Sequence, residues 1–408
     1  MQTKKQKFLG EKGFVLYIAF LSAFIPLSTD LYLPALPRMA ETFNVAPGLV
    51  NLTLIFFFIF YAVGTLFWGP LSDKCGRKPI LLSGLGIYTA TSILCAFAGN
   101  VYHLIIFRIL QAIGSGAVTA VASAVVKDVY SGRKRESILA LVQSLVMIAP
   151  IVAPILGAAI LSLTSWRGVF WTLSLAGLMA TAGAIAMEET IEQRSTGSVF
   201  QLIGRLVVVA KNPGFLSLLI TFTIMAIPMM AFISASSYIY VNQFGLSEEV
   251  FSYFFATNAA FLVIGPLLYI KLSKHVKSNS LITISYIVTI GSGLLIFSIG
   301  DTSPWAFTLS LLPATIAGSI IRPPTTNLML EQQQQDTGAA VSLMSCAFTL
   351  MGAAGMMLIS LGWANRILVM GLMYAIVALI SLLLWLFFSR KPFVRQVTYL
   401  EQIGVRGE

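Results

Sequence analysis

Charge is scarce in this sequence, and that scarcity decides the class of protein first. Asp, Glu, Lys and Arg make up 10% of the 408 residues, whereas soluble domains carry about 25%. Hydrophobic residues make up 57%, and the mean hydropathy is +0.86. An ordinary soluble globular domain is therefore excluded. The longest polar interruption covers only residues 188–213, so a catalytic domain outside the membrane is excluded as well.

Cysteine and histidine are also few. The three cysteines, Cys75, Cys95 and Cys346, are odd in number, and the last two lie in apolar runs, which favours packing residues over a disulfide framework. His103 and His275 are the only histidines. No His/Cys cluster has the spacing of metal ligands, so we expect no metal and no cofactor. A serine–histidine pair and a metal-binding carboxylate pair are missing too, so we do not expect an enzyme.

Long apolar runs are what the sequence has in abundance. A run of about 18 residues spans a bilayer core roughly 30 Å thick. Twelve such runs are present, and we predict an all-α membrane protein with twelve transmembrane helices. The first run is longer than a signal-peptide core and has no small-residue cleavage site, so we expect it to be retained. The runs are centred near residues 24, 59, 88, 114, 150, 177, 228, 261, 288, 318, 349 and 377.

The positive charges predict the orientation. If the N-terminus is cytoplasmic, 21 of the 26 Lys and Arg fall in cytoplasmic segments, and only Arg38, Arg167 and Arg366 fall on the opposite side. Such a bias is typical of inner-membrane proteins, so we predict a multi-pass protein of the bacterial inner membrane with both termini cytoplasmic. Because the cations are scattered over short segments, we expect contact with membrane lipids rather than nucleic acid.

The polar stretch at 188–213 divides the chain once. We predict an N-terminal six-helix bundle at 1–187, this cytoplasmic linker, a C-terminal six-helix bundle at 214–389 and a cytoplasmic tail at 390–408. Two pseudo-repeated bundles with a pathway between them are a common transporter plan. Apolar residues at helical spacing predict a short amphipathic helix on the inner membrane surface within the linker. These residues are Val199, Leu202, Ile203, Leu206 and Val207.

Asp30 is the only one of sixteen acidic residues placed well inside an apolar run. A carboxylate inside a bilayer costs roughly 2.5–3.5 kcal/mol on insertion scales, so it usually marks an ion or substrate path. Counted from Phe14 at 1.5 Å per residue, Asp30 lies within about 6 Å of the outer boundary of the core. We therefore predict that Asp30 carries a proton in a proton-linked transporter.

Four segments resemble a known family. Residues 69–79 read GPLSDKCGRKP, similar to the loop between spans 2 and 3 of the major facilitator superfamily, and residues 108–116 are similar to its R-x-x-Q-G-x-G element, with Ala112 for the usual glycine. Residues 153–158 are similar to the G-P-x-x-G-G signature of its drug/proton antiporters, with alanine at the first and last glycine. Residues 30–37 resemble the first span of the bicyclomycin/chloramphenicol-resistance (Bcr/CflA) branch. The resemblance covers most of the N-terminal half.

This resemblance implies a major facilitator fold and roles for particular residues. Asp73 would face the start of span 11 near Thr337 and Gly338, and Arg77 would pair with Asp128. Together these contacts would latch the two bundles in the outward-open state, while the alternative is a basic loop that only sets topology. The implied latch residues are Gly69, Asp73, Gly76, Arg77, Lys78 and Asp128, and the implied antiporter motif in span 5 is Pro150, Pro154 and Gly157.

Two arginines fall within spans. Arg108 lies about 10 Å below the outer face when counted from Val101, a depth comparable to that of Asp30. Its role is either structural, with hydrogen bonds to backbone carbonyls, or part of proton coupling with Asp30. Arg322 lies about 25 Å down span 10 from Trp305, and we expect its side chain to snorkel to the inner face.

The mixture of Phe, Tyr and Met with few charges suits amphipathic, loosely specified ligands. We expect proton-coupled efflux of small amphipathic compounds or drugs by a monomer that works by alternating access. A proton-driven exporter of one metabolite shares every motif, and a non-transporting membrane sensor is a more distant alternative. The residues expected to line the substrate cavity are Asn51, Phe58, Tyr61, Gln111, Ser115, Gln143, Met147, Met229, Ser236, Tyr240 and Asn258.

Overall fold

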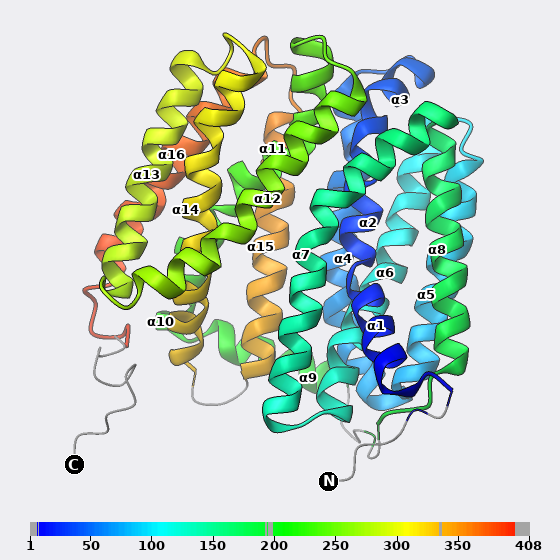
Figure 1. The fold of residues 1–408 in the computed structure, drawn as a ribbon. Helices are drawn as coiled ribbons and strands as arrows, with labels where there is room; N and C mark the ends of the chain where they lie inside the picture. The colour runs from blue at the N-terminus through cyan, green and yellow to red at the C-terminus, as the bar shows by residue number, and fades with distance from the viewer. Residues whose placement is uncertain (1–5, 7, 192–193, 195–198, 334–336, 396–408) are drawn as a thin grey trace, which may run out of the picture. The chain divides into compact units, whose positions relative to one another are not determined.

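The computed structural model describes residues 6, 8–191, 194, 199–333 and 337–395 of the chain. Within them the regular structure is helical, and twelve segments are long and apolar enough to cross a membrane (Figure 1). Each of the twelve centres predicted from the sequence lies inside one of these segments. The predicted all-α membrane fold with twelve transmembrane helices is therefore confirmed.

The chain forms two compact units. The first contains Met1–Leu202 together with Ser236–Ala256, and the second contains Ile203–Ala235 and Thr257–Glu408. The end of span 7 and the start of span 8 thus belong with the first unit, where the Ser252 hydroxyl donates to the Pro154 carbonyl at 3.0 Å. The division into two six-helix bundles at 188–213 stays a prediction.

The first unit contains six spans. The first is interrupted and comprises α1 (Gly10–Ser22), α2 (Phe24–Asp30), the short 3₁₀ helix η1 (Leu33–Ala35) and α3 (Leu36–Phe43). The others are continuous helices, which are α4 (Pro47–Cys75), α5 (Arg77–Ala96), α6 (Val101–Val129), α7 (Gly132–Leu163) and α8 (Trp166–Ala186).

Small residues let the helices of the first unit approach closely. A methyl group added to Gly114 of α6 would lie 2.7 Å from the Gly84 carbonyl of α5. A methyl group added to Gly116 would lie 3.0 Å from the Thr65 backbone nitrogen of α4. Membrane helices depend on such close packing because lipid supplies no hydrophobic driving force between them. Span 4 is therefore held tightly between spans 2 and 3.

The second unit begins with span 7, which is interrupted as well and whose end, from Ser236 onward, belongs to the first unit. Its helices α10 (Pro213–Thr223) and α11 (Ala226–Ser237) are followed by the π-helical turn η2 (Tyr238–Gln243). Pro228 lacks the amide hydrogen that would bond to the Ile224 carbonyl, which accounts for a break at this point. The remaining helices are α12 (Glu248–Leu272), α13 (Ser278–Ile299), α14 (Pro304–Glu331), α15 (Thr337–Ile359) and α16 (Arg366–Phe388).

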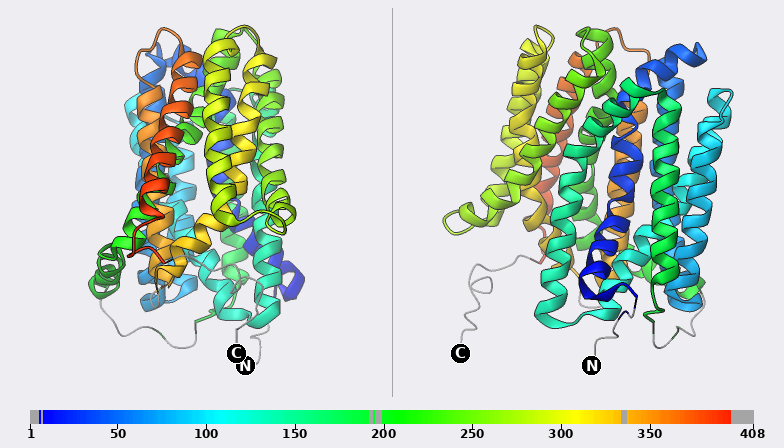
Figure 2. Two further views of the ribbon diagram at one scale, coloured as in Figure 1. Left: turned by 90° about the vertical axis from the view of Figure 1, so that its left-hand side faces the viewer. Right: turned by 45° about the vertical axis from the view of Figure 1, so that its right-hand side comes forward.

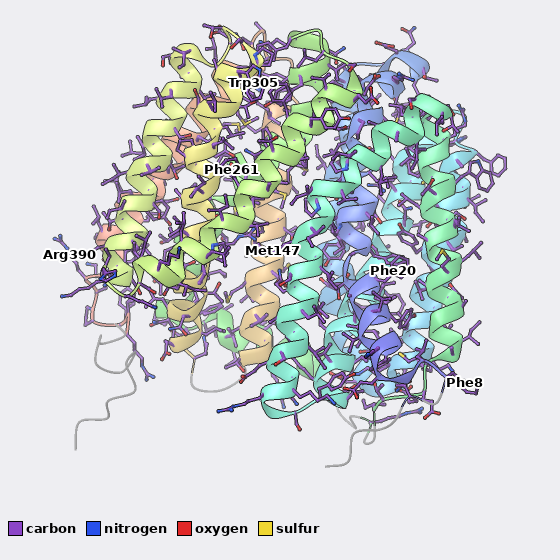
Figure 3. The ribbon with its side chains drawn as sticks, in the orientation of Figure 1. Phe8, Phe20, Met147, Phe261, Trp305 and Arg390 are labelled. Carbon is purple, nitrogen blue, oxygen red and sulfur yellow. The ribbon has the colours of Figure 1, made fainter. Side chains whose placement is uncertain are left out.

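Helix α13 packs along both α14 and α16, as two views of the ribbon show (Figure 1, Figure 2). Trp305, at the start of α14, and Arg390, just after α16, lie at opposite ends of the second unit (Figure 3). A tryptophan at one end and an arginine at the other suit the two interfaces of a bilayer. The long axes of these helices therefore follow the direction expected of a membrane normal.

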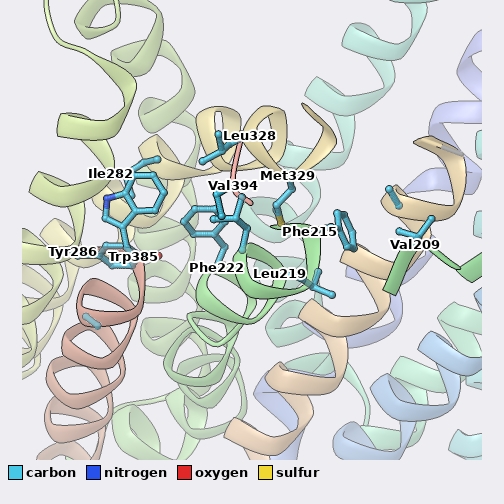
Figure 4. Close-up of a cluster of buried hydrophobic side chains, with 13 residues drawn as sticks. Val209, Phe215, Leu219, Phe222, Ile282, Tyr286, Leu328, Met329, Trp385 and Val394 are labelled. Carbon is cyan, nitrogen blue, oxygen red and sulfur yellow. The ribbon is translucent and has the colours of Figure 1, made fainter. Parts of the chain in front are cut away.

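A buried apolar cluster at one end of the second unit joins several helices (Figure 4). Phe222 of α10 and Trp385 of α16 have ring centroids 5.7 Å apart. Val209, from the helix α9 (Val199–Ala210), is also buried in this cluster. The helix predicted in the linker is therefore present. Val207 is exposed, and the placement of this helix on the membrane surface stays a prediction.

Candidate functional site

Asp30 is a buried carboxylate at the last position of α2, with 6% of its surface exposed. Prolines produce the break on both sides of this short helix. Pro26 lacks the amide hydrogen that would bond to the Ser22 carbonyl, and Pro34 lacks the one that would bond to the Asp30 carbonyl. Span 1 is consequently irregular at Asp30, as is often found where membrane helices bind ions or substrates.

The Asp30 carboxylate has one hydrogen-bond donor among the described residues. The Thr29 hydroxyl donates to its Oδ1 at 2.9 Å. No Lys or Arg among the described residues forms an ion pair with the Asp30 carboxylate. A carboxylate that is buried with a single neutral donor is poorly compensated when it is charged. Such a group is suited to gain and lose a proton as its access to water changes.

Arg108 of α6 is fully buried beside span 1. Its Nη1 donates to the Ser28 carbonyl at 3.1 Å and to Gln111 Oε1 at 2.7 Å. The guanidinium also lies over the Phe57 ring, 4.2 Å from its centroid. The direct pairing with Asp30 that we considered is not formed. Instead Arg108 bonds to a backbone carbonyl, as its structural interpretation predicted, and it holds the turn of α2 that precedes Asp30.

A second pair of hydrogen bonds ties this region to α5. The Ser28 hydroxyl and the Tyr88 hydroxyl lie 2.6 Å apart, and Gln111 Nε2 donates to Ser92 Oγ at 2.6 Å. Sequence reasoning missed Ser28, Tyr88 and Ser92. Their hydroxyls lie in apolar runs, where a buried polar group needs a partner, but only the fold shows which partner each one has.

Arg77 is the centre of an ionic cluster at the other end of the first unit. It is buried, and its Nε donates to Asp128 Oδ2 at 2.8 Å. Its Nη1 donates to Asp73 Oδ1 at 2.5 Å and to Ser72 Oγ at 2.7 Å. The pairing of Arg77 with Asp128 that we expected is therefore present. Its role as a latch, and the place of Asp73 near span 11, stay predictions.

The segment after α8 completes this cluster. Glu189 accepts hydrogen bonds from the backbone amides of Arg77 at 3.0 Å and Lys78 at 3.1 Å, the first two residues of α5. In return, Lys78 Nζ donates to the Ile185 carbonyl at the end of α8, at 2.7 Å. Each helix end receives the charge that its unsatisfied backbone groups favour. Sequence reasoning missed Glu189, and its position just after span 6 was the only available signal.

Two glycines of the predicted latch have different surroundings. Gly76 has a φ of +107°, which favours glycine, and an added methyl group would lie 2.6 Å from Glu189 Oε2. Glycine is therefore needed there for the backbone conformation and for the cap. Gly69 has open space where a methyl group would be, and its carbonyl accepts from the Ser72 hydroxyl at 2.8 Å.

The antiporter motif in span 5 lies against the irregular part of span 1. Pro150 and Pro154 are inside α7, and Gly157 follows one turn later. A methyl group added to Gly157 would overlap the Leu31 carbonyl oxygen and lie 2.9 Å from the Leu31 carbonyl carbon. Gly157 thus lets α7 touch the backbone of the residue directly after Asp30. This contact gives a structural reason for glycine at position 157, which is the one glycine of the G-P-x-x-G-G signature that the chain retains.

The predicted cavity residues of the first unit differ in exposure. Asn51, Phe58, Gln111, Ser115, Ser236 and Tyr240 are buried, Tyr61 and Met147 are half-buried, and Gln143 is exposed. Gln111 and Ser115 pack inside the unit, and Tyr240 stacks on Phe254 with centroids 5.0 Å apart. Met147 lies about half-way along α7 (Figure 3). Whether any of them contacts a substrate stays a prediction.

In the second unit, Asn258 is buried and Met229 is half-buried. Asn258 Nδ2 donates to Thr315 Oγ1 at 2.9 Å, so its side chain joins α12 to α14. Met229 contacts Arg322, whose Nη2 lies 3.8 Å from the Met229 sulfur. The expectation that Arg322 snorkels to the inner face is wrong, because its head group contacts residues in the middle of neighbouring spans.

The family model of the Major Facilitator Superfamily matches residues 18–356 of this chain. The chain belongs to this superfamily. It is 28% identical over 349 residues to the uncharacterized MFS-type transporter YdgK of Bacillus subtilis, with 83% of this chain and 87% of that protein covered. It is 26% identical to a bicyclomycin resistance protein homolog of Haemophilus influenzae, with 86% and 89% covered.

A chloramphenicol resistance protein of Pseudomonas aeruginosa is 30% identical over 251 residues, which cover 61% of this chain and 59% of that one. These relatives support the predicted Bcr/CflA branch of drug/proton antiporters. Among solved structures, a D-xylose-proton symporter has a TM-score of 0.72 at 14% identity, with 94% of this chain and 98% of that chain covered. That likeness shows the fold. The superfamily match and the bacterial relatives support a multi-pass transporter of the inner membrane.

Proposed function

We propose that this transporter exports small amphipathic compounds in exchange for protons by alternating access. Asp30 is the observation that supports this proposal most directly. It is the only carboxylate deep inside a span, it lies at a break in that span, and its described donor is a single hydroxyl. A proton-driven pump needs a group whose charge changes as its access to water alternates, and Asp30 meets this requirement.

The relatives favour drugs or similar compounds as the cargo. Two of them are named for resistance to bicyclomycin and to chloramphenicol. We propose that the carrier is a monomer whose termini are cytoplasmic, and that the Arg77 cluster stabilises one of its two states. Susceptibility screening of a pump-deficient bacterium that expresses the chain would supply a substrate for the tests below.

The decisive experiment changes Asp30 and measures transport in proteoliposomes with an imposed pH gradient. Asp30→Asn keeps the shape of the side chain but cannot titrate, so gradient-driven efflux should fall to background while substrate binding persists. Asp30→Glu restores a titratable group one methylene longer and should recover part of the activity. Asp301→Asn is the matched control, because Asp301 is exposed in the turn after α13.

Full gradient-driven transport by Asp30→Asn would overturn this assignment. The proton site would then have to lie at the span ends, with Asp128 as the first candidate.

A further inference from the structure

We propose that Arg322 is a binding site for the acidic group of an amphipathic anion, so that the transporter accepts compounds with an aromatic or apolar body and one carboxylate or similar group. This inference rests on the proposed function and deepens it, because it names a class of substrate. Nothing in the family motifs described above includes Arg322.

The position of the guanidinium is the first step. Arg322 belongs to α14, and its head group contacts Met229 of α11 and Phe348 of α15. Met229 lies close to the middle of the span Pro213–Gln243, and Phe348 is the central residue of α15. The charge is therefore held at mid-depth of the second unit. Helical side chains lean towards the helix N-terminus, which directs Arg322 away from the nearer end of α14.

The lack of a partner is the second step. A guanidinium has five N–H donors and cannot lose its charge. Among the described residues, Arg322 has two partners. Its Nη2 lies 3.8 Å from the Met229 sulfur, and its Cζ lies 5.1 Å from the centroid of the Phe348 ring. Both are weak, and no described carboxylate forms an ion pair with Arg322. In the spans of the second unit the sequence offers only Glu331, the last residue of α14.

Arg108 provides a comparison within the same chain. It is also an arginine inside a span, but it is fully buried and donates to two oxygen atoms, of Ser28 and Gln111. Arg322 donates to no oxygen atom of the described residues, and its side chain is exposed. A charge at mid-depth that faced only lipid would be costly. The difference indicates that Arg108 is sealed into the structure, whereas Arg322 remains available to a solute.

The chemistry around Arg322 defines the ligand. A planar guanidinium matches a carboxylate with two parallel hydrogen bonds. Phe348 and Met229 are half-buried and offer an aromatic face and an adaptable thioether beside the charge. An aromatic monoanion uses all three groups. A neutral analogue of the same shape uses only the two apolar ones.

The test compares 2-naphthoate with 2-naphthamide, which have the same ring and differ in charge. Binding to the purified full chain in detergent is measured by titration calorimetry, without a proton gradient. The parent protein should bind naphthoate more tightly than naphthamide by about 10-fold to 100-fold, the value of a charge-assisted hydrogen bond. Arg322→Gln should abolish that preference, and Arg322→Lys should keep part of it.

Arg390→Gln is the matched control, since it removes an exposed arginine just after α16 of the same unit. Equal affinity of the parent for the two probes would overturn the proposal, as would an unchanged preference in a folded Arg322→Gln variant. The result is separable from that for Asp30. If Asp30→Asn transports normally but naphthoate binding still depends on Arg322, the antiport mechanism fails and the anion site stands.

Discussion

Asp30, Arg108 and Arg322 are three charged side chains inside spans, and each has different surroundings. Among the described residues, Asp30 has one hydroxyl donor, Arg108 has two oxygen acceptors and two aromatic rings, and Arg322 has a sulfur and one ring. Of the three, Arg108 has the most compensation, because its Nη1 donates to two oxygen atoms and two rings face its guanidinium, although its Nε and Nη2 are buried without a hydrogen-bond partner among the described residues. The two charges left with little compensation are the ones on which a proton and an anionic ligand can act.

At the ionic cluster, Glu189 allows a prediction about stability. Glu189→Ala removes the carboxylate that caps α5, so the free energy of unfolding should fall by about 1–2 kcal/mol. The measurement is an unfolding titration with SDS in mixed micelles. Glu188→Ala is the matched control, because Glu188 is the neighbouring glutamate and its side chain forms no hydrogen bond or ion pair with the described residues, while its backbone amide donates to Gln6 Oε1. Equal loss in both variants would show that the cap adds no stability.

Among the helices, the two interrupted spans show how far sequence reasoning reaches. Apolar length placed all twelve spans, and the family motifs placed Arg77 beside Asp128. The prolines at 26 and 34 also explain why span 1 is irregular at Asp30, once the missing amide hydrogens are traced to their carbonyls.

Other features were beyond the reach of one sequence. The cap by Glu189 joins residues more than 100 positions apart, and no local pattern specifies such a contact. The prediction that the Arg322 side chain points to the inner face was wrong, because distance along α14 does not show which neighbouring helix has room for the side chain. Periodicity gives a helix its buried face, whereas partners across helices depend on the packing of the whole unit.

At the contact between span 5 and span 1, even a small side chain at position 157 should be destabilising. Gly157→Ala places a methyl group against the Leu31 carbonyl, so the backbone next to Asp30 must shift. Overpacking of this kind typically costs about 1–3 kcal/mol. We expect lower stability together with reduced gradient-driven transport, measured on the same purified protein.

Gly86→Ala is the control for that change. Gly86 lies in the interior of α5, and nothing lies within 4 Å of an added methyl group. Because alanine favours a helix over glycine by roughly 0.5–1 kcal/mol, Gly86→Ala should be neutral or slightly stabilising. Normal stability and transport in Gly157→Ala would mean that this close contact does not matter.

For the whole molecule, the compact units do not follow the halves of the chain. Residues Ser236–Ala256 belong with the first unit. There Arg38 and Glu248 form an ion pair with two hydrogen bonds, from Nε to Oε1 at 2.6 Å and from Nη2 to Oε2 at 3.2 Å. Arg38 Nη1 also donates to the Leu161 carbonyl at the end of α7. The end of span 1, the end of span 5 and the start of span 8 are thus joined around one arginine.

The orientation of the whole chain follows from its basic residues and can be tested directly. The N-terminal segment, every second connection between spans and the C-terminal tail together hold 21 of the 26 Lys and Arg, so these segments should be cytoplasmic. Alkaline phosphatase, which is active only outside the cytoplasm, should be inactive when fused after Lys211 or His275. It should be active after Gly245 or Asp301. Fusions of green fluorescent protein at the same four positions provide the complementary control, since they should fluoresce only after Lys211 and His275. The opposite pattern at all four positions would invert the proposed topology, and protons and substrate would then have to be assigned to the reverse faces.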